Sequence, residues 1–148
     1  MPEPDYIPPD LTLYGEEHIR RYRETDGEVG YIWNGVPTLL LTARGRKTGE
    51  ARTQALIFGR DGDDYVVIAS VGGMPAHPAW YLNVVAEPRA SIQVKGEHLE
   101  VEARTASDEE KSRLWQMMAE QWPNYDTYQA RTTREIPVVL LRPLGTGK

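Results

Sequence analysis

Short apolar runs, each bounded by turn-forming residues, recur along the chain and predict a protein built mainly from β-strands. The run at 65–70 (YVVIAS) follows an Asp-Gly pair, which favours a β-hairpin with the preceding run at 53–58. Polar and apolar residues alternate through 98–104, as expected for a strand with one exposed face. The predicted strands are residues 38–43, 53–58, 65–70, 91–95, 98–104 and 137–141.

Capping and spacing signals predict a smaller set of helices. Ser107 followed by Glu110 is a capping box that opens a helix extending to about residue 121, and Pro123 ends it. Residues 15–24 and 79–85 are the other predicted short helices, and residues 124–131 follow Pro123 as a shorter aromatic segment. Six strands with few helices favour an α+β fold, a small and mainly antiparallel β-barrel without doubly wound order.

Composition limits the function classes. The chain has 148 residues, of which 40% are hydrophobic, a size that suits one domain. It has no cysteine, which excludes disulfides, thiolate metal ligands and cysteine nucleophiles. No apolar run reaches the ~20 residues of a membrane helix, and the first residues are acidic, unlike a signal peptide. We expect a cytoplasmic protein with an N-terminal extension at 1–32, containing a short helix, and a folded barrel domain at 33–148.

The charge is unevenly distributed. Residues 1–28 hold eight acidic and three basic residues, which account for the whole formal net charge of −5. In the balanced remainder, the stretch 43–53 (ARGRKTGEART) carries four basic residues and one glutamate. This compact cluster predicts a bounded anion site and argues against a nucleic-acid surface, where basic residues spread over a whole face.

Several catalytic signatures are absent or incomplete. Residues 45–48 (GRKT) resemble part of a phosphate-binding loop, but the required glycine spacing is missing. No GxGxxG motif follows a strand, so a Rossmann dinucleotide site is unsupported. His18, His77 and His98 lie far apart without metal-ligand spacing, so no metal site is predicted. Ser70 lies outside any GxSxG motif, which argues against a serine hydrolase.

The basic turn and a later glycine pair are candidates for a binding site. The cations of the turn are Arg44, Arg46, Lys47 and Arg52. With the Thr48 hydroxyl and Gly49, they offer charge-assisted donors to a phosphate or carboxylate, although a solvated turn would have the same composition. Gly72 and Gly73 would let the backbone approach a flat ligand closely, or would only turn the chain.

Two aromatic sets complete the candidates. Trp80 and Asn83 share a face of the helix predicted at 79–85, where burial of the indole in the core is the alternative interpretation. Trp122, Tyr125 and Tyr128 are spaced by three and could line one side of a cavity with indole and phenol groups, or could belong to the core.

Three separated segments resemble a known family. LLLTARGRKTGEARTQAL (39–56), ASVGGMPAHPAWYLNVVAEP (69–88) and WPNYDTYQARTTREIPVVLL (122–141) are similar to the deazaflavin (F420)-dependent nitroreductases of actinobacteria. That family belongs to the split β-barrel flavin-binding proteins, and the resemblance covers about residues 33–143. It implies a split barrel with a helical segment packed on it, and it implies coenzyme F420, whose tail carries a phosphate and several glutamates.

The resemblance also implies site residues by position. The cofactor-binding residues would be Arg46, Lys47, Thr48, Gly49 and Arg52 for the tail, Gln54, Ala55, Leu56 and Ile57 along the ring, Ser70, Val71, Gly72 and Gly73 at the ring or its ribityl arm, and Trp80 and Asn83 in support. Trp122, Tyr125 and Tyr128 would bind the substrate. Some relatives carry a lysine where this chain has Val71, which would alter how the ring is held or which acceptor is taken.

The implied activity is hydride transfer from the reduced deazaflavin to a quinone, enone or nitroaromatic acceptor. Ser70, Tyr125 and Tyr128 would be the catalytic residues, hydrogen-bonding the acceptor oxygen as negative charge develops on it. Two alternatives stay open: a deazaflavin-binding module without catalysis, and an FMN-binding split-barrel flavoprotein. We expect a monomer without nucleic-acid partners, in which the N-terminal extension covers the pocket as a lid or contacts a membrane surface.

Overall fold

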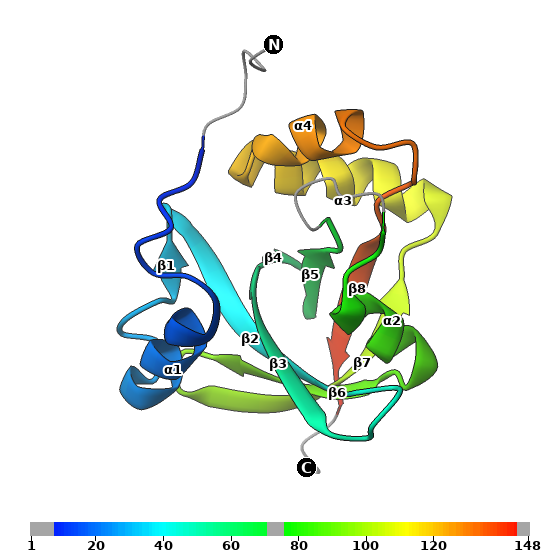
Figure 1. The fold of residues 1–148 in the computed structure, drawn as a ribbon. Helices are drawn as coiled ribbons and strands as arrows, with labels where there is room; N and C mark the ends of the chain where they lie inside the picture. Colours follow the sequence, from blue (N-terminus) through cyan, green and yellow to red (C-terminus); the bar gives the residue numbers. More distant parts are fainter. Residues whose placement is uncertain (1–7, 71–75, 145–148) are drawn as a thin grey trace.

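The computed structural model describes residues 8–70 and 76–144. In this part of the chain, eight strands pair entirely antiparallel in the order β1-β2-β6-β7-β8-β5-β4, with β3 paired to β2 outside that path (Figure 1). The strands are β1 (Ile32–Trp33), β2 (Val36–Arg44), β3 (Ala51–Ile57), β4 (Gly59–Asp61), β5 (Asp64–Ile68), β6 (Arg89–Val94), β7 (Glu97–Thr105) and β8 (Val138–Pro143). The curled sheet confirms the predicted α+β antiparallel split barrel.

Four helices of the described chain pack around this sheet. They are α1 (Gly15–Thr25), α2 (Ala79–Ala86), α3 (Asp108–Gln121) and α4 (Asn124–Ala130). Figure 1 shows α3 and α4 together across one end of the barrel, with α1 towards the other end, where it contacts β3. The three predicted helices are therefore confirmed, and the aromatic segment that follows Pro123 forms the fourth helix, α4. None of these helices is long and apolar enough to cross a membrane.

Two apolar clusters share the central strands. Val67 of β5 and Leu141 of β8 lie in the barrel core, whereas their neighbours Val66 and Leu140 point to the opposite face, under α3 and α4. Successive side chains of a strand alternate between faces, so strands covered on both sides read as continuous apolar runs. This explains why YVVIAS and PVVLL lack the alternation seen in β7.

One predicted hairpin has a different partner. The turn at Asp61-Gly62 is present, but it joins β4 to β5, whereas β3 pairs with β2. The prediction of a 53–58/65–70 hairpin was therefore wrong. The chain leaves β3 at Phe58, whose backbone N–H donates to the Pro37 carbonyl and whose side chain enters the core. The short strands β1 and β4 were missed because runs of two and three residues carry no readable periodicity.

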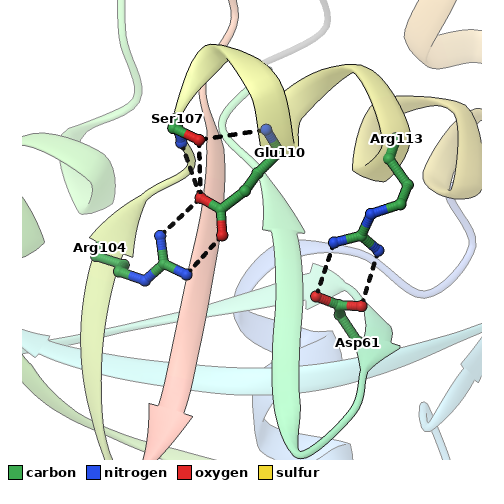
Figure 2. A network of polar contacts seen from close by, with 5 residues as sticks. All are labelled: Asp61, Arg104, Ser107, Glu110 and Arg113. Atoms are coloured by element: carbon green, nitrogen blue, oxygen red, sulfur yellow. Dashed lines mark hydrogen bonds and ion pairs between the residues drawn. The ribbon is translucent and has the colours of Figure 1, made fainter.

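A polar network fastens α3 to the barrel (Figure 2). The Ser107 hydroxyl accepts from the Glu110 backbone N–H while the Glu110 carboxylate accepts from the Ser107 N–H, which confirms the capping box. Arg104 at the end of β7 donates two hydrogen bonds of 2.8 Å to the same carboxylate. Arg113, one turn further along, pairs with Asp61 of β4 at 2.9 Å. Arg104, with the Ser107 N–H second, lowers the pKa of Glu110 to about 2.

The N-terminal helix is anchored in the barrel by one phenol. Tyr22 is fully buried, its hydroxyl lies 3.0 Å from the Thr38 carbonyl and 3.3 Å from the Gln93 carbonyl, and it accepts from the Lys95 N–H at 2.8 Å. Burial raises the pKa of Tyr22 to about 12, so the hydroxyl keeps its proton. The helix of the predicted extension is thus tied to β2 and β6.

Candidate active site

A cavity of about 540 Å³ opens between the N-terminal segment, β3 and the α3–α4 end of the barrel. The N-terminal region supplies Pro9, Leu11, Tyr14, Gly15, His18 and Ile19, the strands supply Trp33, Thr38, Gln54, Ala55, Leu56, Ile57 and Ile68, and Ser70, Trp122, Tyr125 and Tyr128 complete the lining. Regions remote in sequence therefore meet around one space, and most of the lining is apolar or aromatic, as in ligand sites generally.

The β3 wall of the cavity exposes a strand edge. Residues 51–57 pair with β2 on one side, and no strand of the described chain pairs on the other. In an antiparallel strand, the N–H and C=O of one residue point to one neighbouring strand, and those of the next residue point to the other side. Every second residue of Gln54–Ile57 therefore directs its N–H and C=O away from β2, where they are available to a ligand. A flat heterocycle with polar atoms along its edge suits this wall.

The predicted aromatic residues form the other wall. Trp122 follows α3, and Tyr125 and Tyr128 project from α4 into the same cavity, with the two phenol rings edge-to-face at 6.1 Å. Trp122 also packs against Trp33 of β1 at 5.8 Å. Burial, with a smaller contribution from Tyr128, raises the pKa of Tyr125 above its usual range. Tyr125 therefore stays neutral and can donate its O–H to an acceptor oxygen without readily giving up the proton.

The basic turn joins β2 to β3 at the far end of this wall. Gly49 adopts φ +78°, its N–H donates to the Gly45 carbonyl, and the Thr48 hydroxyl accepts from the Glu50 N–H. Thr48 therefore closes the turn. Arg46 and Lys47 are exposed, and neither has an ion-pair partner within the described residues. Two cations on an ordered turn are thus available to an anion.

A buried amide fixes the direction of one of these cations. Asn83 of α2 is 4% exposed, and its Oδ1 accepts from the backbone N–H of Arg46 at 3.1 Å and from its guanidinium at 3.0 Å. Asn83 and Trp80 were predicted to support the cofactor together. In the structure Trp80 packs in the barrel core, whereas Asn83 faces the turn.

Arg52 points outward on the same strand as the ring-side residues. It is exposed and lies 3.8 Å from Glu50, a loose contact that leaves its charge available. Arg23 of α1 lies nearby in space, donating to the Thr53 hydroxyl at 2.8 Å. This arginine was not predicted, because it lies in the acidic N-terminal region and only the fold brings it to β3.

Ser70 lies on the cavity wall at the end of the described segment 8–70. Its carbonyl accepts from the Arg134 guanidinium at 2.8 Å, and the neighbouring Ala69 carbonyl accepts from it at 3.2 Å. Arg134 also contacts His77 Nδ1 at 3.0 Å. Burial and, second, Arg134 lower the pKa of His77. The predicted residues Val71, Gly72 and Gly73 lie outside the described residues.

Comparison with known proteins places the chain in a family. A model of the F420H(2)-dependent quinone reductase family matches residues 14–143, most of the chain. The chain belongs to this family. Membership confirms the predicted resemblance, the enzyme class of an F420-dependent reductase, and coenzyme F420 as the cofactor.

The curated relatives and solved structures similar to this chain include F420-dependent reductases. An F420H(2)-dependent quinone reductase of Mycobacterium tuberculosis (strain ATCC 25618 / H37Rv) is 43% identical over 128 residues, covering 84% of this chain and 86% of that protein. The solved structure of an F420-H2 dependent reductase (FDR-A) is 37% identical with a TM-score of 0.67, covering 72% of this chain and 94% of that one. A solved structure described as a domain-swapped dimer is 35% identical with a TM-score of 0.69, covering 85% and 95%. The expected monomer stays a prediction.

The residues present fit the family's cofactor. The open edge of β3 suits the polar edge of a deazaflavin ring, and the exposed Arg46 and Lys47 suit its anionic tail. The turn does not line the cavity itself, but β3 connects the two: Arg52 and Gln54 lie two residues apart on one strand, about 7 Å at the usual strand rise. A ligand with a flat head and a long anionic tail would follow this strand.

Proposed function

We propose that the acceptor of this F420-dependent reductase is a quinone, bound in the cavity between the β3 edge and the tyrosines of α4. The observation that supports this most is one apolar space with a strand edge on one side and the neutral phenol of Tyr125 on the other. A quinone is flat, apolar and carries two carbonyl oxygens, so it matches both walls.

The predicted residues of the basic turn, of β3 and of the cavity wall have roles in this proposal. When bound, reduced F420 supplies a hydride. Arg46, Lys47 and Arg52 hold its tail, and the backbone of Gln54–Ile57 with Ser70 orients its ring. Thr48, Gly49 and Asn83 keep the basic turn in shape.

The aromatic wall positions the acceptor. Trp122 and Tyr128 stack against it, and Tyr125 donates its O–H to the carbonyl oxygen on which negative charge develops. A donor that keeps its proton, held in an apolar cavity, lowers the energy of the charged oxygen without being consumed. The N-terminal segment 8–19 supplies the outer lining, which supports the prediction that the extension covers the pocket.

The test is turnover of short-chain quinones with reduced F420, followed by the absorbance of oxidised F420, for the wild type and for Tyr125→Phe. We expect kcat to fall about 100-fold or more with F420 affinity changed less than about twofold, since one oxyanion donor is typically worth about 100-fold or more. Phe keeps the ring packing against Trp115 and Tyr128. Equal rates for both proteins would remove Tyr125 from the reaction.

Nitroaromatics and enones are the competing acceptors and are assayed in parallel. A quinone kcat/KM below that of either competitor would contradict the proposal. Binding of F420 without turnover of any acceptor would favour the non-catalytic module.

A further inference from the structure

His18 is the buried titratable group of the cavity to which the proposed reaction gives no role. It lies on α1, is 3% exposed and lines the cavity. Among the described lining residues, the other side chains that can titrate are the phenols of Tyr14, Tyr125 and Tyr128, together with hydroxyls that do not ionise in water. An imidazole can hydrogen-bond a reacting oxygen and transfer a proton to it, so His18 is a candidate general acid.

One edge of the imidazole is fixed by the loop before β1. Nε2 lies 2.9 Å from the Gly30 carbonyl, and because a carbonyl can only accept, Nε2 carries a hydrogen. The same carbonyl accepts from the Thr38 hydroxyl at 2.6 Å. Gly30 has φ +103°, and a Cβ there would lie 2.8 Å from His18 Cδ2. The Cδ2–Nε2 edge of the imidazole therefore packs against the Gly30 backbone so closely that any residue with a Cβ would clash with the ring.

The opposite nitrogen, Nδ1, has no partner among residues 8–70 and 76–144. Within these residues the Gly30 contact is the one hydrogen bond that His18 makes, yet none of their buried side-chain nitrogens or oxygens lacks a partner. Nδ1 must therefore reach accessible surface. Since His18 is otherwise enclosed and lines the cavity, that surface is the cavity. Trp33 lies nearly parallel to the ring, 19° between planes, and limits its tilt.

We propose that His18 is a catalytic residue of the acceptor site, which hydrogen-bonds a quinone oxygen through Nδ1–H and transfers that proton to it. The inference rests on the proposed function. Hydride transfer reduces the quinone by two electrons and leaves a hydroquinone monoanion. The Nδ1–H bond breaks, the proton forms the O–H bond of the neutral hydroquinone, and His18 is left neutral with Nε2–H still on Gly30. Solvent then returns a proton to Nδ1.

The surroundings permit this cycle. Tyr22 on its own helix and Tyr125 from α4 have raised pKa values, so neither is ionised over the working range. Tyr14 and Tyr128 are the other phenols of the cavity. From β1 and β2, Trp33 and Thr38 carry no charge. Glu17, Arg20, Arg21 and Glu24 pair with one another on the exposed face of α1.

Two substitutions test the two ring nitrogens of His18 separately. His18→Gln places an amide N–H where Nε2 donates to Gly30 and removes Nδ1. His18→Asn places an amide near Nδ1 and loses the Gly30 contact. His98→Gln, at an exposed position on β7, is the matched control. Each protein is assayed for quinone turnover, for F420 affinity, and for melting temperature.

His18→Gln should melt within about 2–3 °C of wild type, bind F420 normally and lose about 100-fold in kcat, since general acid catalysis contributes about 100-fold or more. His18→Asn should melt lower, because it loses the Gly30 contact. A His18→Gln protein with the wild-type kcat would overturn the inference while leaving the quinone reductase intact, and wild-type inactivity towards quinones would overturn both.

A binding readout is independent of turnover. The chain has three histidines, so ¹⁵N-histidine NMR spectra are assigned by comparison with His18→Gln and His98→Gln. Adding a quinone to the protein should shift the Nδ1 signal of His18 and leave that of His98 unchanged. An unmoved His18 signal at saturating quinone would place Nδ1 away from the acceptor and overturn the inference.

Discussion

Arg46→Ala tests the anion site of the basic turn. The guanidinium is exposed and is oriented by the buried Asn83 amide, so its charge is directed but not neutralised. A charge-assisted hydrogen bond contributes about 1.5–3 kcal/mol, whereas an exposed ion pair contributes about 0.2–1 kcal/mol. We expect the exposed but oriented Arg46 to contribute about 1–2 kcal/mol to the binding free energy, which lies between these ranges. Arg46→Ala should therefore weaken F420 affinity roughly 5- to 30-fold.

Isothermal titration at several salt concentrations measures this loss. The screening length is about 10 Å at 0.1 M salt and about 3 Å at 1 M, so the ratio of the two dissociation constants should be largest at low salt and shrink as salt rises. Arg20→Gln is the control, since it removes one positive charge from the exposed face of α1, where Glu17 and Glu24 already balance it. We expect its effect to be less than twofold.

Asn83→Ala isolates the contribution of orientation. It keeps the charge of Arg46 and removes the oxygen that accepts both of its hydrogen bonds, so F420 affinity should fall about 2- to 5-fold with the wild-type salt dependence. Dissociation constants equal for wild type and Arg46→Ala at every salt concentration would refute the reasoning, and the turn would then be a solvated loop.

Two further predictions concern stability. Tyr22→Phe removes the buried hydroxyl that joins α1 to Thr38 of β2 and Gln93 of β6, so urea unfolding should show a loss of about 1–3 kcal/mol in unfolding free energy. An unchanged unfolding midpoint would contradict the anchoring. Glu110→Gln removes a carboxylate whose folded-state pKa is about 2, below its ordinary 4.5. The ionised Glu110 carboxylate stabilises the fold fully above pH 4.5, and this stabilisation disappears as pH falls towards 2. The difference in melting temperature between Glu110→Gln and wild type should therefore be largest at about pH 6 and nearly absent at about pH 2. A difference that stays constant over this range would contradict the prediction.

The elements with strong local signals were predictable from the sequence. Ser107 and Glu110 mark the start of α3 because a capping box is a contact between residues three apart. The apolar runs of β5 and β8 are long enough to be recognised as strands. Because both faces of these strands are buried, the sequence does not show which residues belong to the barrel core and which pack under α3 and α4. The partner of β3 could not be predicted, because an Asp-Gly turn fixes a hairpin without showing how far its strands extend.

The site was predicted as far as the family motifs reach. Gln54–Ile57, Ser70 and the three C-terminal aromatic residues do meet at one cavity. The sequence shows no metal-ligand spacing around His18 and gives no other signal for it, beyond its position one turn before the buried Tyr22 on the inward face of its helix. Its role depends on Gly30 and Thr38, whose approach to α1 is a property of the tertiary fold.

The most direct test of the account is titration of the purified protein with oxidised F420 and, separately, with FMN. Tryptophan fluorescence is a suitable signal because Trp33 and Trp122 line the cavity. The account predicts micromolar or tighter F420 binding, tighter than FMN, which lacks the polyglutamate tail that the basic turn would hold. Tighter binding of FMN, or binding of neither, would contradict it.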